Sequence, residues 1–222
     1  MPLQFANSAA QSFFWIFCVL FVGAVVTALV FCYRGKNTPA ALCRAGALAA
    51  LGSMMVCLVP TAPLLYFSCF FMALYALGEL KDAWTVRCVA FAVFAAAQIF
   101  NVVTMAKLLS FQIPVYAYIL LGLLVVGIGV GTFLLPKRRP LKTVFQVERI
   151  VLSTLAAIFA LILIIDNLLY STIFLMFGYA LYAGEAFFPE REGTRRAYYK
   201  TIFYALGQGL IYVGLALSIV AI

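Results

Sequence analysis

Residues 13–31 read FFWIFCVLFVGAVVTALVF, a run without a charged side chain. A helix needs about 20 apolar residues to cross the hydrocarbon core of a bilayer, and this run has that length. Residues 1–12 carry no charge either, and no small-residue cleavage pattern follows the run, so it differs from a secretory signal. We therefore interpret it as a first membrane span.

The composition of the whole chain extends this interpretation. Of its 222 residues, 67% are apolar and 10% are charged, whereas an average soluble domain is about 25% charged. Too few polar residues remain to cover a water-exposed surface. The sequence therefore predicts an all-α fold, a polytopic membrane helix bundle in which residues 1–222 form a single transmembrane domain of about eight spans.

Apolar runs separated by charges or prolines predict where the spans lie. The second connection is tight, around Pro60 and Pro63, and the sixth is little more than Asp166 and Asn167, so each joins two spans in a hairpin. The expected spans lie near Ala9–Phe31, Ala40–Val59, Ala62–Gly78, Trp84–Ala106, Pro114–Leu135, Ile150–Ile165, Leu168–Phe188 and Tyr198–Ile222.

The positive charges gather in alternate connections. Fourteen of the fifteen Lys and Arg residues fall in the first, third, fifth and seventh connections or at the span ends beside them, and only Lys107 does not. Short loops rich in cations stay in the cytoplasm, so we expect both termini outside and an even number of spans. The net charge of +8 is then explained by topology and anionic lipid, without a nucleic-acid partner. The fourteen are Arg34, Lys36, Arg44, Lys81, Arg87, Lys137, Arg138, Arg139, Lys142, Arg149, Arg191, Arg195, Arg196 and Lys200.

A weak internal repeat relates residues 1–110 to residues 111–222. Residues 73–79 read ALYALGE at the end of the third expected span, and residues 180–185 read ALYAGE at the end of the seventh. Four spans separate the two copies, so both have the same orientation. This is the arrangement of a parallel 4+4 repeat.

The two copies end in Glu79 and Glu185, the main candidates for chemistry. An ionisable group inside a membrane costs on the order of 3 kcal/mol to insert, and is a functional candidate for that reason. Two carboxyl groups in a partly desolvated cavity differ in acidity, so that one can act as an acid and the other as a base. The alternative is that both lie at the water interface beside neighbouring cations.

Further polar residues share helix faces with the glutamates or lie half-way along the fourth and eighth spans. A tyrosine precedes each glutamate by about one turn, and two glutamines each share a face with another polar residue. Together they predict a cavity that opens to the inner leaflet. Its expected substrate-binding residues are Tyr75, Gln98, Asn101, Tyr182, Tyr204 and Gln208.

The absence of some residue types limits the chemistry. The chain has no histidine, and its six cysteines lie in or beside apolar runs without paired spacing. A Ser-His-Asp or Cys-His arrangement is therefore impossible, and a zinc site of the usual kind is not expected. The cysteines in such runs behave as small hydrophobic residues. We expect neither a metal nor another cofactor.

These residues resemble those of the lysoplasmalogenase-like family of eight-span membrane proteins, also called the YhhN family. Its members carry Leu-Gly-Asp at the end of one span and Ser-Asp at the end of a later one; this chain has Leu77-Gly78-Glu79 and Gly184-Glu185 there. The family's last span reads Tyr-x-x-Ala-Gln before an aliphatic run, and residues 204–211 here read YALGQGLI. The resemblance covers most of the chain.

The resemblance implies hydrolysis of the vinyl ether bond of lysoplasmalogens, with Glu79 and Glu185 as the catalytic acid and base. The acid protonates the vinyl ether carbon, and water activated by the base adds to the resulting cation. The hemiacetal then collapses to an aldehyde and a glycerophospho-alcohol. Arg44, where the family has a Lys-Pro pair, would meet the phosphate, while Gln98 and Gln208 would orient water or glycerol hydroxyls.

Both acidic positions depart from the family, because each holds Glu in place of Asp. The carboxyl group moves by about one bond length, and a displacement near 1 Å can lower a rate by about a hundredfold. Two other classes therefore stay open: a non-catalytic lipid-binding relative, and a small membrane transporter, which the repeat and the mid-span glutamines suggest. The polar groups favour the cytoplasmic half, which fits a hydrolase better than a transporter.

The expected location is a bacterial cytoplasmic membrane, crossed many times by the chain. The expected partners are a lysophospholipid or lysoplasmalogen substrate and the surrounding membrane lipids. The sequence does not predict the oligomeric state.

Overall fold

The computed structural model describes residues 8–78, 80, 84–108, 169–187 and 194–221, and its regular elements are all helices. No strand occurs in these ranges, which confirms the all-α prediction for the part described. The helices are α1 (Ser8–Tyr33), α2 (Asn37–Leu58), α3 (Pro63–Gly78), α4 (Trp84–Leu108), α7 (Leu169–Phe187) and α8 (Thr194–Ala221).

Each of these six helices matches one expected span to within a few residues. The fifth and sixth expected spans, Pro114–Leu135 and Ile150–Ile165, lie outside the described residues, so the count of eight and the internal repeat stay predictions. Three helical segments are long and apolar enough to cross a membrane: Ser8–Tyr33, Asn37–Leu58 and Thr201–Val220. These three segments support the membrane-protein class that the composition predicts.

Local sequence explains the two short connections that are fully described. After α1, Gly35 has a φ of 69°, and the Lys36 N–H donates to the Phe31 carbonyl at 2.9 Å. This is a Schellman ending, in which glycine adopts the left-handed conformation at no steric cost. After α2, Pro63 begins α3 at the position where a missing N–H breaks no helical hydrogen bond. The α2–α3 connection is the hairpin predicted around Pro60.

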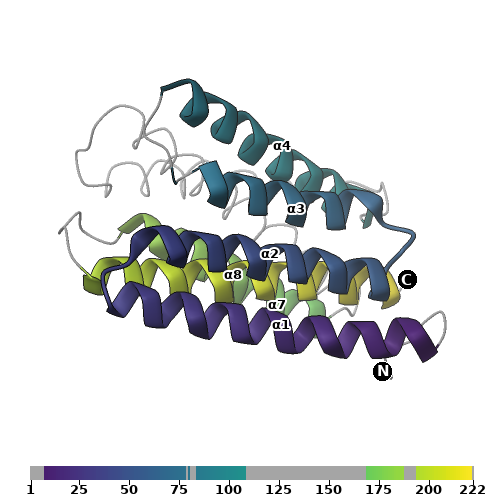
Figure 1. The fold of residues 1–222 in the computed structure, drawn as a ribbon. Helices are drawn as coiled ribbons and strands as arrows, with labels where there is room; N and C mark the ends of the chain where they lie inside the picture. The colour runs from purple at the N-terminus through teal and green to yellow at the C-terminus, as the bar shows by residue number, and fades with distance from the viewer. Residues whose placement is uncertain (1–7, 79, 81–83, 109–168, 188–193, 222) are drawn as a thin grey trace.

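Helix α8 is central, because it packs against α1, α2, α3, α4 and α7, which are all the other described helices. Figure 1 shows the N-terminus of α1 and the C-terminus of α8 at one end of the bundle. The α1–α2 connection and the starts of α4 and α8 lie at the opposite end. We call this opposite end the basic end, since it holds the described connections and helix starts that carry Arg34, Lys36, Arg195 and Arg196.

Helix α1 is peripheral. In its most apolar 18-residue stretch only 11% of the residues are buried, against 56% in the corresponding stretch of α2 and 61% in that of α8. The exposed side chains of α1 are large and apolar, Trp15, Ile16, Val19 and Leu20 among them. In a membrane such a face contacts lipid, so α1 forms an outer wall of the bundle.

Glycines bring α7 and α8 into backbone contact. A Cβ atom on Gly178 would lie 2.8 Å from the Ile211 backbone nitrogen, and one on Gly214 would lie 3.0 Å from that of Leu175. A Cβ on Gly207 would lie 3.1 Å from the Gly178 carbonyl oxygen. Small residues let membrane helices approach in this way, with van der Waals packing as the main attraction.

Gly178→Ala should destabilise the protein by about 1–3 kcal/mol, because the added methyl group overlaps the α8 backbone. The matched control is Gly46→Ala, since a Cβ on Gly46 would meet nothing within 4 Å. Thermal unfolding in detergent, followed by circular dichroism, should show a lower midpoint for Gly178→Ala alone. Equal midpoints for the two variants would contradict the close α7–α8 contact.

Candidate functional site

One face of α8 carries four buried polar side chains, Thr201, Tyr204, Gln208 and Tyr212, none more than 5% exposed. Residues three or four apart lie on the same face of a helix, so these side chains form a continuous strip, here called the polar ladder. Hydrocarbon offers no hydrogen bonds. Each polar atom of the ladder therefore needs a partner within the protein or from a bound molecule.

At the basic end of the polar ladder, Thr201 meets α1 and α2. Nη1 of Arg44 donates a long hydrogen bond of 3.5 Å to Thr201 Oγ1, and the Cys32 sulfur lies 3.3 Å from the same oxygen. Thr201 is fully buried, whereas Arg44 is half-buried. Arginine suits such a position, because its aliphatic stem packs on the bundle while its charged end stays near water or lipid headgroups.

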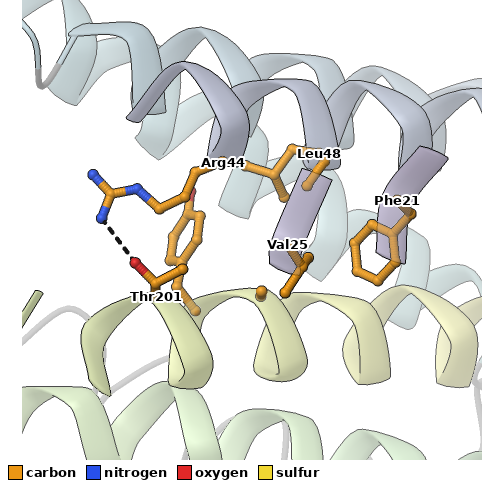
Figure 2. A pocket seen from close by; sticks show the side chains of 8 residues that line it. Phe21, Val25, Arg44, Leu48 and Thr201 are labelled. Carbon is orange, nitrogen blue, oxygen red and sulfur yellow. Dashed lines mark hydrogen bonds between the residues drawn. The ribbon is translucent and has the colours of Figure 1, made fainter. Parts of the chain in front are cut away.

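Arg44 and Thr201 also line a pocket between α1, α2 and α8. Figure 2 shows them at one end of this pocket, with Val25 and Phe21 further along. The cavity volume is about 10 Å³, near the minimum for one water molecule. Beyond the polar end and Tyr204 the walls are apolar, and the full lining is Phe21, Val25, Arg44, Ala47, Leu48, Thr201, Tyr204 and Ala205.

Further along the polar ladder, Tyr212 joins α3 and α4 in a closed ring of hydrogen bonds. Ser68 Oγ donates to Asn101 Oδ1 at 2.7 Å, and Asn101 Nδ2 donates to the Tyr212 hydroxyl at 3.4 Å. Ser68 has a single proton, so in its contact with Tyr212 the tyrosine hydroxyl is the donor. All three side chains are at most 1% exposed. The ring uses both hydroxyl protons and ties three helices together.

Two buried glutamines lie one turn closer to the basic end than the ring. Gln98 precedes Asn101 by three residues on α4, and Gln208 precedes Tyr212 by four on α8, so their depths are similar. Gln98 Nε2 makes a weak contact with the Met72 sulfur, at 3.8 Å. Within the described part of the chain, neither Nε2 nor Oε1 of Gln208 has a hydrogen-bond partner.

The predicted tyrosines occupy separate surroundings. Tyr75 packs against Phe94 of α4, with ring centroids 4.8 Å apart. Tyr182 is fully buried on α7, where its backbone nitrogen lies 3.3 Å from the position of a Cβ on Gly207. Tyr204 lines the pocket of Arg44.

The structure does not bring all the predicted binding residues together, and some of them belong to two separate groups that contact α8. Arg44 and Tyr204 belong to the pocket at the basic end, and Asn101 belongs to the ring with Ser68 and Tyr212. Gln208 lies on the polar ladder between these groups.

The side chains of both predicted catalytic glutamates lie outside the described residues. Glu79 follows the last residue of α3, and Glu185 is within two residues of the end of α7. These helix ends lie at the basic end of the bundle (Figure 1). Among the described residues α3 and α7 each pack on α8 and not on one another. A cavity shared by both carboxylates stays a prediction.

In the ranges that the structure covers, no three His, Cys, Asp or Glu residues gather closely enough to hold a metal ion. The described cysteines are free thiols, as expected for small hydrophobic residues in apolar spans. They are Cys18, Cys32, Cys43, Cys57 and Cys69; the side chain of Cys88 lies outside the described part.

The fold and the buried polar groups define a helical membrane protein with a hydrogen-bonding interior. No family model matches the chain, and no curated protein or solved structure matches it either. A more specific identity therefore has to be proposed from the residues themselves.

Sequence inspection did not single out Ser68 or Tyr212, the partners of Asn101. A signal for Tyr212 existed, because it lies one turn beyond Gln208 on the same face. Ser68 offered no such signal. A serine in an apolar helix commonly bonds to its own backbone, as Ser53 does with the Ala49 carbonyl at 3.0 Å.

Tyr212→Phe should lower stability by about 0.5–2 kcal/mol, since it opens the ring and leaves the Asn101 amide and the Ser68 oxygen with one partner fewer. The control Tyr33→Phe removes the same hydroxyl from a side chain that is 78% exposed. Thermal unfolding in detergent should separate the two variants. Equal unfolding temperatures for the two variants would show that the ring does not stabilise the fold.

Proposed function

We propose that this protein is a lysolipid hydrolase of the inner leaflet, similar to the lysoplasmalogenase-like family, and that it cleaves a vinyl ether bond. The observation that carries the proposal is the pocket at the basic end. There a guanidinium group and a hydroxyl group stand at one end of an otherwise mostly apolar slot. This combination fits a single-chain amphiphile with an anionic head.

The chemistry of each end supports a lysolipid in particular. A guanidinium pairs with phosphate through two parallel hydrogen bonds, and Arg44 is half-buried, where such a pair is less screened than in water. Phe21, Val25 and Leu48 continue the slot as a hydrocarbon surface. The slot is too narrow for a chain as it stands, so binding requires the α1 side chains to move. The peripheral position of α1 favours such a movement.

The catalytic step in this proposal belongs to Glu79 and Glu185. One carboxylic acid transfers its proton to the vinyl ether carbon, and the other carboxylate takes a proton from the water that attacks the resulting cation. The carbon–oxygen bond of the hemiacetal then breaks, giving an aldehyde and the glycerophospho-alcohol. The helix ends that carry both positions lie at the same end of the bundle as the Arg44 pocket, which is what a substrate with its phosphate on Arg44 requires.

The finer topology belongs to the same proposal. Eight spans in a parallel 4+4 repeat, with both termini outside, would place the basic end in the cytoplasm. The described helices fit this, since the start of α1 and the end of α8 lie together at the opposite end. The membrane proposed is a bacterial cytoplasmic membrane.

Glu79→Gln and Glu185→Gln should each lower turnover at least a hundredfold, because an amide keeps the shape of the side chain but cannot exchange its proton. The double variant should be hardly worse than either single one, since the pair acts as a unit. The assay is aldehyde release from purified protein, with lysophospholipids that do or do not contain the vinyl ether. Glu148→Gln, which alters a carboxylate predicted to lie in the fifth connection, serves as the control.

Full activity in both single variants would contradict the glutamate mechanism. A wild-type protein that binds lysolipids and turns over none of them would instead identify the non-catalytic lipid-binding relative. Transport of the lipid without cleavage would identify the transporter.

Arg44→Gln should raise the KM for a phosphate-bearing lysolipid about ten- to a hundredfold, with little change in kcat, because a charge-assisted pair to the head group is lost. The KM for a 1-alkenylglycerol, which has no phosphate, should stay unchanged. The control Arg34→Gln removes an exposed arginine at the same end and should alter neither value. An equal rise for both substrates would mean that Arg44 acts through the fold and not through phosphate.

A further inference from the structure

Gln208 is the least satisfied polar side chain in the described part of the bundle. It is 1% exposed, and neither of its amide atoms has a hydrogen-bond partner there. Interchanging the nitrogen and the oxygen would not help, because both atoms lack a partner. A buried amide in this condition destabilises a fold, and an apolar side chain of the same length would not. Packing alone therefore does not account for a glutamine at this position.

The position of Gln208 on the polar ladder indicates which part of a bound molecule its amide would meet. Tyr204, one turn and about 6 Å before it, lines the Arg44 pocket. Tyr212, one turn after it, is part of the closed ring and has its hydroxyl proton committed to Ser68. Among the described residues of the polar ladder, Gln208 is thus the first beyond the pocket whose amide atoms lack a hydrogen-bond partner. Helical side chains lean toward the helix N-terminus, which for α8 is the Arg44 end.

We propose that Gln208 binds the free glycerol hydroxyl of a lysolipid whose phosphate is held by Arg44, an inference that rests on the proposed function. An amide can both donate to a hydroxyl oxygen and accept its proton, so it matches a hydroxyl in either direction. A diacyl lipid carries an ester at that carbon, which can only accept and is much larger. Gln208 then selects lysolipids over diacyl lipids, because the hydroxyl can donate to the amide oxygen as well as accept from the amide nitrogen, whereas the ester can only accept.

The test measures binding without turnover, in the Glu79→Gln/Glu185→Gln background. The two probes are 1-acyl lysophosphatidic acid and its deoxy analogue, in which hydrogen replaces the free hydroxyl. Affinities are measured in detergent by ligand-induced thermal stabilisation. The hydroxyl probe should bind about three- to tenfold more tightly, as expected for one buried hydrogen bond.

Gln208→Met keeps the length of the side chain and should abolish this preference, binding both probes like the weaker one. Without lipid it should unfold at a higher temperature than the parent, because an unsatisfied amide has been removed. Gln208→Leu provides a second variant with the same two expectations. The control Ser218→Ala changes another buried polar side chain of α8, whose hydroxyl bonds within its own helix to the Gly214 carbonyl, and should keep the preference.

Equal affinity of the parent protein for the two probes would overturn the inference, as would a preserved preference in both Gln208 variants. Lower stability of both variants without lipid would also overturn it, by showing that the amide has a structural partner. If the proposed hydrolase function is wrong but this binding site exists, the results differ from those above. A hydroxyl preference that depends on Gln208, together with no cleavage by the unmutated protein, would retain this binding site and remove the hydrolase.

Discussion

The structure depends on one constraint: a membrane offers no hydrogen bonds, so each polar side chain within the bundle needs a partner in the protein or in a bound molecule. Helix α8 concentrates these groups on the polar ladder and packs against all the other described helices. Thr201 connects it to α1 and α2, and Tyr212 connects it to α3 and α4. Helix α8 contacts α7 through Gly207 and Gly214, where close backbone packing takes the place of side-chain hydrogen bonds. The central place of α8 follows from these two kinds of contact.

The polar side chains of the interior differ in how many of their hydrogen bonds are made within the protein. This difference distinguishes the groups that stabilise the fold from those that we propose bind a ligand. The ring of Ser68, Asn101 and Tyr212 uses both of its hydroxyl protons, so it stabilises the arrangement of three helices. Arg44 is half-buried at one end of a mostly apolar pocket, and Gln208 is buried with no hydrogen-bond partner for its amide among the described residues. A bound molecule adds most where it meets an arginine beside an apolar pocket, or a buried polar group that the described residues leave without a hydrogen bond. The proposals therefore concern Arg44 and Gln208 rather than the ring.

About half of the candidate site could be predicted from the sequence. Rarity of polar groups in apolar runs was enough to select Gln98, Asn101, Tyr204 and Gln208, all of which are buried as expected. Their partners could not be selected in this way. Asn101 bonds to Ser68, 33 residues away, and to Tyr212, 111 residues away, and such pairs depend on how each helix is rotated about its axis. Helical spacing gives the face of a residue but not the helix that the face meets.

The sequence by itself determined that the chain is helical and membrane-spanning, where six of its helices lie, and where the α2–α3 hairpin turns. These features depend on local quantities: the length of an apolar run, the rigidity of proline and the placement of charge. Only the tertiary structure decided that α8 is central, that Arg44 and Asn101 belong to different groups, and that Gly178, Gly207 and Gly214 form one contact. Those features arise from packing between helices that are distant in the chain. The role of a glycine or a serine there depends on which residue of the other helix it contacts, and the local sequence does not specify that residue.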